Sequence, residues 1–334
     1  MIKALIRIIF LGGALTLAGC DHTSLPEVSM LPAAASNPRA SSASQSEAAD
    51  DFVATGAECG IDRRQVATMV YLPMGSDLGE GILGCVLLRA PARVRNAGLH
   101  DRLWTISRAL IPDADEFRIE RFILAQDGRT DTLAFVATLD DQGRSWEYGI
   151  NLQDLNLLDR SVFEELLSTI IHEYAHILTL NETQVTYDSA LLASYTDMEM
   201  SDAEYEALLV EVEADCSVAS GVFDGEACFM PGSYLFDFYH GFWDWYGEDA
   251  LELAFQGTLF KDYRTDFVND YAATSPTEDF AESFAAWLMP EHGAFLITET
   301  VEDKFAFFES QPELMTLRDQ IEAGLDEVRA GRIF

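Results

Sequence analysis

The sequence predicts an α+β fold in which a small, antiparallel-rich sheet is followed by a mostly helical region. Three strand-like runs separated by turn signals lie between residues 116 and 155. A long segment with helical spacing follows them from about residue 159. The chain is 49% hydrophobic and 11% aromatic, so it can bury a sizeable core.

The chain opens with "MIKALIRIIFLGGALTLAGC", a basic start followed by an apolar run and small residues before Cys20. This order predicts a signal peptide over residues 1–19, too short for a durable membrane span. The ending "LAGC" resembles a bacterial lipobox, which implies that Cys20 is lipidated and anchors the chain on a membrane. The implied location is the bacterial cell envelope, facing the periplasm. Asp21 resembles an inner-membrane retention signal.

Residues 20–50 are rich in Ser, Ala and Pro with few large apolar side chains, which predicts a disordered tether. The folded domain is expected over 51–334, with a sheet-containing part at 51–157 and a helical part at 158–334. The net charge of the whole chain, −36, disfavours nucleic acid and anionic lipid headgroups as partners. The acidic residues form either a solvated face or a surface that prefers cationic partners.

Four cysteines remain after Cys20, an even number that favours two disulfides in an exported protein. We expect the local pairs Cys59 with Cys85 and Cys216 with Cys228, against the alternative of buried free thiols. The spacings contain no Cys-x-x-Cys, which argues against a cysteine zinc site.

The first elements expected in the folded region are a helix and three strands. Residues 100–111, "HDRLWTISRALI", have helical spacing, and the strand-like runs cover 116–126, 131–140 and 145–155. The turn signals "DGRT" and "DQGR" separate the runs. We therefore expect an antiparallel meander directly before the next helix.

That helix contains "HEYAH" and is expected to begin near Asp159 or Ser161, with Glu164 and Glu165 in its first turn. At about 100° per residue from Phe163, His172 lies about 180° and His176 about 220° away, off the apolar stripe. The stripe consists of Phe163, Leu166, Leu167, Ile170, Tyr174, Ile177 and Leu178.

Two histidines one turn apart on a polar face can both donate a nitrogen to one zinc ion. Glu173 between His172 and His176 then stands beside the metal, where a base acting on water is needed. The pattern predicts one zinc per chain. A catalytic zinc also needs a third protein ligand, which this helix does not contain.

Three schemes could supply the third ligand. The metzincin pattern fails, because its glycine position is Thr179 and its last histidine position is Glu182. A second scheme takes Glu211, with Asp215 four residues later, from "EVEAD". A third scheme draws on "YAATSPTEDFAESFAAWL", residues 271–288.

This last stretch resembles the third-ligand region of gluzincins related to the anthrax lethal factor catalytic domain and the zinc-binding metallopeptidases grouped near it. In both, a tyrosine and then Glu-x-Phe-Ala-Glu follow the His-Glu-x-x-His helix. The resemblance covers under a tenth of the chain and implies a zincin-like fold. It also implies Glu278 as third ligand, Tyr271 as oxyanion stabiliser and Glu282 as a supporting carboxylate. Unlike the family, this chain places 101 residues between His176 and Glu278.

Read from its residues alone, the same stretch predicts a helix with Ser275 as N-cap, Pro276 at its first position and Glu278 at N3. In such a capping box Glu278 could serve only to cap the helix. The small side chains of Ala281, Ala285 and Ala286 would allow close approach to another helix. We favour Glu278 over Glu211, because Tyr271 adds an electrophile that the other scheme lacks.

The remaining histidines give weaker signals. His22 lies in the tether, and His100 and His292 have no partner pattern. His240 stands among aromatic residues and is expected to be packed in the core.

The expected function is zinc-dependent hydrolysis of a peptide or protein substrate by activated water, with Glu173 as general base. One alternative is a non-catalytic envelope lipoprotein that uses the same scaffold to bind a partner or a metal. Another is a zinc hydrolase of a non-protein amide or ester.

Overall fold

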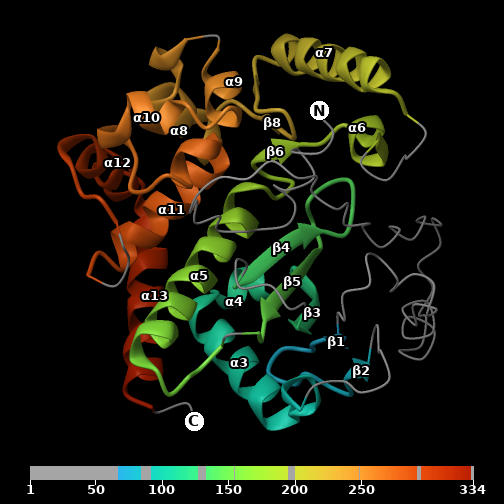
Figure 1. Ribbon diagram of the computed structural model, residues 1–334, viewed down its shortest axis with the longest axis vertical. Coiled ribbons are helices and arrows are strands. Elements are labelled where there is room, and N and C mark those ends of the chain that lie inside the picture. The colour runs from blue at the N-terminus through green and yellow to red at the C-terminus, as the bar shows by residue number, and fades with distance from the viewer. Residues whose placement is uncertain are drawn as a thin grey trace, which may run out of the picture.

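The computed structural model describes residues 67–83, 92–126, 133–153, 155–194, 200–247, 249–291 and 295–331. The expected signal peptide, the tether, and Cys20, Cys59 and Cys85 lie outside these residues. The fold is α+β, as the sequence predicts (Figure 1). Among the described helices, none combines the length and the apolar character that crossing a membrane requires.

The main sheet has five strands in the order β2-β1-β3-β5-β4. The strands are β1 (Ala67–Tyr71), β2 (Ile82–Leu83), β3 (Ile119–Gln126), β4 (Ala134–Thr138) and β5 (Trp146–Asn151). Three of the pairings are antiparallel, but β3 pairs with β5 in parallel.

The predicted meander is therefore wrong, although the three predicted strands exist. The chain leaves β3, forms β4 at the outer edge of the sheet and returns as β5 between the two. Alternating hydrophobicity identifies a strand but does not say which strand is its neighbour. Burial agrees with the observed order, since β5 is buried at nearly every position and β4 alternates.

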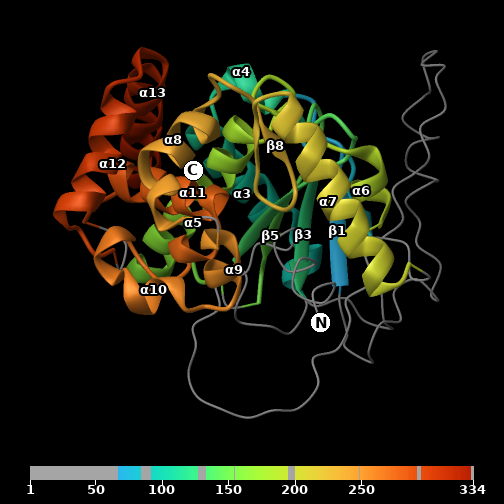
Figure 2. The ribbon, with the colours of Figure 1, turned by 90° about the horizontal axis from the view of Figure 1, so that it is seen from above.

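Helices lie along one side of this sheet and form most of the second half of the chain (Figures 1 and 2). A second, three-stranded sheet has the order β6-β8-β7. Its strands are β6 (Val185–Thr186), β7 (Val222–Phe223) and β8 (Cys228–Phe229). The helices are α3 (Ala97–Leu110), α4 (Asp113–Glu116), α5 (Arg160–Thr179), α6 (Ser189–Ser194), α7 (Asp202–Val218), α8 (Tyr234–Phe242), α9 (Ala250–Phe255), α10 (Leu259–Asp262), α11 (Pro276–Leu288), α12 (Glu299–Glu309) and α13 (Pro312–Arg329).

Helix α5 is the predicted His-Glu-x-x-His helix, and it begins where the sequence predicts. The Asp159 side chain caps it by accepting a hydrogen bond from the Ser161 amide at 2.9 Å. Glu164 and Glu165 follow the first turn, so their predicted place in it is wrong. The Glu164 carboxylate instead accepts from Arg329 of α13 at 2.7 Å.

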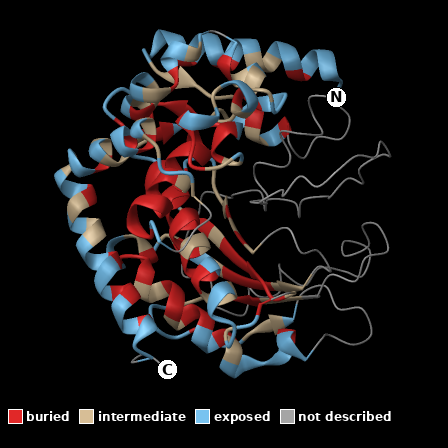
Figure 3. Cartoon of the chain, turned by 60° about the vertical axis from the view of Figure 1, so that its left-hand side comes forward, coloured by how far each residue is buried: buried red, intermediate tan, exposed pale blue. Residues whose placement is uncertain are grey.

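The core lies around α5, which packs against α3, β4 and α11 (Figure 3). Its apolar stripe joins the main core, as predicted. The opposite face, which carries His172 and His176, is buried as well, because α11 covers it. A face that would be polar and solvated in an isolated helix is thus enclosed.

Cys216 and Cys228 form the predicted disulfide, with their Cα atoms 5.6 Å apart. The bridge joins the last turn of α7 to strand β8. It fastens a helix that contributes little to the main core, since only Tyr205, Val212 and Cys216 of α7 are buried.

Candidate metal centre

Three side chains from α5 and α11 converge at the contact between these helices. The Nε2 atoms of His172 and His176 lie 3.1 Å apart. Oε2 of Glu278 is 3.2 Å from the first nitrogen and 3.4 Å from the second. All three residues are buried, and their ligand atoms could hold one metal ion.

The spacing of these atoms fits a tetrahedral zinc ion. Zinc bonds of about 2.0–2.2 Å at tetrahedral angles place ligand atoms about 3.3–3.6 Å apart. The observed separations of 3.1, 3.2 and 3.4 Å are close to that range. Glu278 Oε2 is also buried without a hydrogen bond, and a bound cation would offset the cost of burying it.

Helix α11 presents Glu278 in its first turn. Ser275 caps the helix by accepting a hydrogen bond from the Glu278 amide at 3.1 Å, and Pro276 occupies the first position. The Glu278 carboxylate points to the histidines, and its Oε1 accepts a hydrogen bond from the Tyr271 hydroxyl at 2.8 Å. Glu278 is therefore not merely a capping residue.

The competing third ligand lies elsewhere. Glu211 and Asp215 are exposed on α7 and do not belong to the cluster around His172 and His176. Glu182, at the last position of the metzincin pattern, forms an ion pair with Arg118. Of the three schemes, only the one based on Glu278 brings a third ligand to the histidines.

A second carboxylate supports the His172 ring. Oε1 of Glu282, one turn after Glu278, lies 2.9 Å from His172 Nδ1. Asn269 donates a hydrogen bond to the other Glu282 oxygen at 2.6 Å. A carboxylate behind a ligating imidazole fixes the ring and increases its basicity. Sequence reasoning named Glu282 for this position but missed Asn269.

The electrostatics of the cluster suit a cation. Burial raises the pKa of Glu173, and the neighbouring histidines only partly oppose this. Burial would also raise the pKa of Glu278, but His176 and His172 hold it below its usual range. The Tyr271 pKa is raised by burial and by the Glu278 charge, so Tyr271 keeps its proton and remains a donor.

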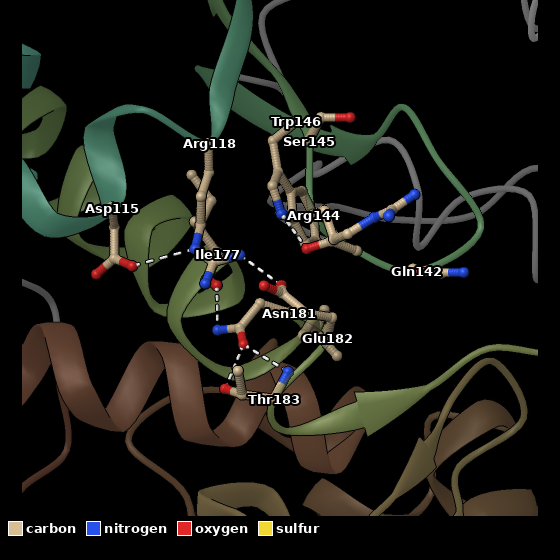
Figure 4. A network of polar contacts seen from close by, with 12 residues as sticks. Asp115, Arg118, Gln142, Arg144, Ser145, Trp146, Ile177, Asn181, Glu182 and Thr183 are labelled. Atoms are coloured by element: carbon tan, nitrogen blue, oxygen red, sulfur yellow. Dashed lines mark hydrogen bonds and ion pairs between the residues drawn. The ribbon is translucent and has the colours of Figure 1, made fainter. Parts of the chain in front are cut away.

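A polar network ties the C-terminal end of α5 to the sheet (Figure 4). The Asn181 side-chain amide donates to the Ile177 carbonyl at 3.1 Å, which satisfies a backbone oxygen in the last turn of α5. Arg118, immediately before β3, forms ion pairs with Asp115 and Glu182. The helix end that carries His176 is thus held from two sides.

A cavity lies next to the cluster. It measures about 30 Å³ for a water-sized sphere, room for roughly one or two such groups. Its lining comprises Val136, Trp146, Glu173, His176, Leu180, Tyr187, Glu226, Ala227, Thr277 and Glu278. The cavity therefore joins Glu173 and two ligands to strands β4 and β5 and to the segment between β7 and β8.

Sequence reasoning missed Glu226 altogether. The Asp-Gly pair at residues 224 and 225 is a hairpin signal, but nothing in the sequence says that this hairpin reaches the histidines. Burial raises the pKa of Glu226 well above its ordinary value, and the charges of Asp224 and Glu278 raise it further.

Two other histidines have structural explanations. His100 is buried, with Nδ1 2.7 Å from the Tyr71 hydroxyl and Nε2 2.8 Å from the Arg93 carbonyl. His240 is exposed on α8, where its Nδ1 lies 2.7 Å from Asp244. The prediction of a core position for His240 is wrong, because its ring packs edge-on against Phe236, 4.4 Å between centroids, on a side of α8 that remains exposed. His22 and His292 lie outside the described residues.

No family model, curated protein or solved structure matches the chain. What the site can do is therefore argued from its geometry. Two imidazole nitrogens and a carboxylate oxygen converge beside an enclosed glutamate, which is an arrangement suited to binding a metal ion and moving a proton next to it.

Proposed function

We propose that this chain is a zinc-dependent peptidase of the gluzincin type, with a zincin-like catalytic domain. The convergence of His172, His176 and Glu278 around one point, with Glu173 in the adjoining cavity, carries the proposal. Two nitrogens, one oxygen and an open position form a donor set of catalytic zinc sites. A zinc ion in such a set acts as a Lewis acid towards water and a carbonyl oxygen.

Two residues have separate roles in the proposed reaction: Glu173 transfers protons and Tyr271 stabilises negative charge. Glu173 accepts a proton from the attacking water and delivers it to the leaving amine. Burial raises the pKa of Glu173, which favours the protonated form that the second step needs. Tyr271 keeps its proton, and its hydroxyl, which donates to Glu278 in the structure, would turn to donate a hydrogen bond to the oxygen on which negative charge develops.

Strand β4 is the proposed guide for the substrate. It is one of the two edge strands of the described sheet, and its Val136 lines the cavity together with Glu173 and His176. An extended peptide can add to such an edge through backbone hydrogen bonds. This pairing would present a peptide bond to Glu173 without demanding a particular side chain.

The setting of the enzyme is part of the proposal. Cys20 is the lipidated first residue of the mature chain, and residues 20–50 tether the domain to the membrane. The domain faces the periplasm of a bacterial envelope, with the inner membrane favoured by Asp21. These statements depend on the motif in the first 21 residues alone.

The test compares Glu173→Gln with Glu165→Gln in the purified full chain. Glu165 is exposed on the same helix, so it is a matched control. Zinc content is measured by mass spectrometry, and cleavage of a mixed peptide library is measured with and without a chelator. We expect one zinc in both variants and roughly a 100-fold or greater loss of turnover in Glu173→Gln only.

Two results would overturn the proposal. One is a folded full chain that takes up no stoichiometric zinc, and the other is chelator-sensitive cleavage that Glu173→Gln leaves intact. Zinc uptake with no peptide cleavage, but with hydrolysis of small amides or esters, would keep the metal site and replace the substrate class. Zinc uptake without any hydrolysis would favour the non-catalytic lipoprotein.

A further inference from the structure

A tight hairpin turn brings Glu226 to the candidate metal centre. The turn joins β7 to β8, with Gly225 in the left-handed region at φ +104°. Oδ1 of Asp224 accepts hydrogen bonds from the amides of Glu226 and Ala227, each at 3.0 Å. The Cys216–Cys228 disulfide fastens the next strand, two residues after Glu226. The position of Glu226 in the cavity wall is therefore well supported.

One oxygen of the Glu226 carboxylate has no hydrogen-bond partner among the described residues. This oxygen, Oε1, is also inaccessible to solvent. The residues that line the cavity include no lysine or arginine. The free-energy cost of burying a carboxylate oxygen without a donor falls once a cation or a hydrogen-bond donor reaches it.

A cationic group would be a suitable partner for Glu226. Burial and the neighbouring carboxylates disfavour its charged form, and a positive charge placed beside it in the cavity would favour that form again. The cavity holds roughly one or two water-sized groups, which matches an ammonium group. Apolar lining from Val136, Leu180 and Ala227 suits the aliphatic stem that carries such a group.

We propose that Glu226 forms an anionic subsite beside the metal centre and takes a cationic group of the substrate. This inference rests on the proposed peptidase function and narrows its substrate class to peptides with a positive charge near the scissile bond. A lysine side chain, an arginine side chain and a free N-terminal amine share this chemistry. The Glu226 carboxylate forms an ion pair with the cationic group and so determines which peptides are preferred, while Glu173 remains the general base.

The experiment uses the full chain and peptides that differ only by lysine or norleucine at each position around the cleaved bond. Arginine peptides and N-terminally acetylated peptides show whether the subsite recognises a lysine side chain, an arginine side chain or the N-terminal amine. Glu226→Gln is compared with Glu213→Gln, a control that removes one negative charge from the exposed face of α7. Both variants change the net charge of −36 equally, so long-range attraction of cationic peptides cancels between them.

We expect the wild type and Glu213→Gln to prefer one cationic group by roughly tenfold or more in kcat/KM. Glu226→Gln should keep its zinc and lose that preference, measured as the ratio of kcat/KM for cationic and neutral peptides within the same variant. An equal rate for cationic and neutral peptides in the wild type would overturn the subsite. A preference that survives in Glu226→Gln would overturn it too.

A binding measurement separates this inference from the proposed function. Calorimetry with the Glu173→Gln background measures the affinity for the same lysine and norleucine peptides without cleavage. A lysine preference that disappears in Glu173→Gln/Glu226→Gln supports the subsite even when no peptide is hydrolysed by the wild type, in which case only the peptidase proposal fails. Equal affinities in Glu173→Gln, together with normal peptide hydrolysis by the wild type, overturn the subsite alone.

Discussion

Helices α7 and α11 begin with the same sequence signal and use it differently. Each has a serine N-cap with a glutamate three residues later, Ser201 with Glu204 and Ser275 with Glu278. In α7 the Glu204 carboxylate turns back and accepts a hydrogen bond from the Ser201 amide at 2.8 Å, completing a capping box. In α11 the Glu278 carboxylate turns towards the histidines of α5.

The difference follows from what packs against each helix. Helix α7 buries three side chains, and water surrounds the rest of its acidic surface. Helix α11 is buried at nearly every position between α5, α8 and α12, so its first-turn carboxylate meets protein instead of solvent (Figure 3). A capping signal thus defines where a helix starts, while the neighbours decide what its N3 carboxylate does.

The largest expected difference between the two helices concerns metal binding. Glu278→Ala removes one of three ligands and should reduce zinc affinity by more than the roughly 10–100-fold that loss of a supporting residue costs. Glu211→Ala on α7 should leave zinc content unchanged. Both are measured by zinc titration of the full chain. Zinc retained in Glu278→Ala and lost in Glu211→Ala would reverse the assignment.

The next largest effect concerns what holds α11 in place. Lys304 of α12 is buried and contacts both oxygens of Asp279, at 2.7 and 2.6 Å, next to Glu278. Lys304→Ala leaves a buried carboxylate unpaired, which should cost about 3–5 kcal/mol of unfolding free energy. Urea unfolding measures this, with Lys261→Ala at an exposed position as the control. A loss below about 1 kcal/mol would mean that packing alone secures α11.

A smaller and more local effect is expected from the disulfide of α7. The bridge closes a loop with a sequence separation of 12, and loops of this size contribute about 3 kcal/mol in the chain-entropy account. The double variant Cys216→Ser/Cys228→Ser should speed hydrogen exchange in α7 and the β7–β8 hairpin, with α11 unchanged. Faster exchange in α11 as well would show that the two helices unfold together.

The smallest effect is expected at the α7 cap. Glu204→Ala removes the carboxylate half of the capping box and should cost about 0.5–1 kcal/mol. Hydrogen exchange of the first turn of α7 is the sensitive measurement, and zinc content is the internal control. Any loss of zinc in Glu204→Ala would contradict the expectation that α7 has no part in metal binding.

The sequence by itself determined several of the elements and half of the candidate site. The α+β class, the strands β3, β4 and β5, the start of α5 and the Cys216–Cys228 bridge follow from local patterns, because turn residues, caps and hydrophobic periods act over a few residues. The pairing of His172 with His176 is also local, since helical geometry alone places residues four apart side by side. The strands β1 and β2 and the second sheet were not predicted.

Tertiary structure decided the rest. Whether Glu278 or Glu211 joins the histidines depends on which helix covers the polar face of α5, and spacing in sequence does not contain that information. The predicted antiparallel meander and the predicted core position of His240 were wrong for a similar reason, because strand pairing and exposure also depend on distant parts of the chain. Glu226 is the clearest case, because its hairpin is recognisable in the sequence but its place beside His176 and Glu278 comes from long-range packing of α5, α11 and β8.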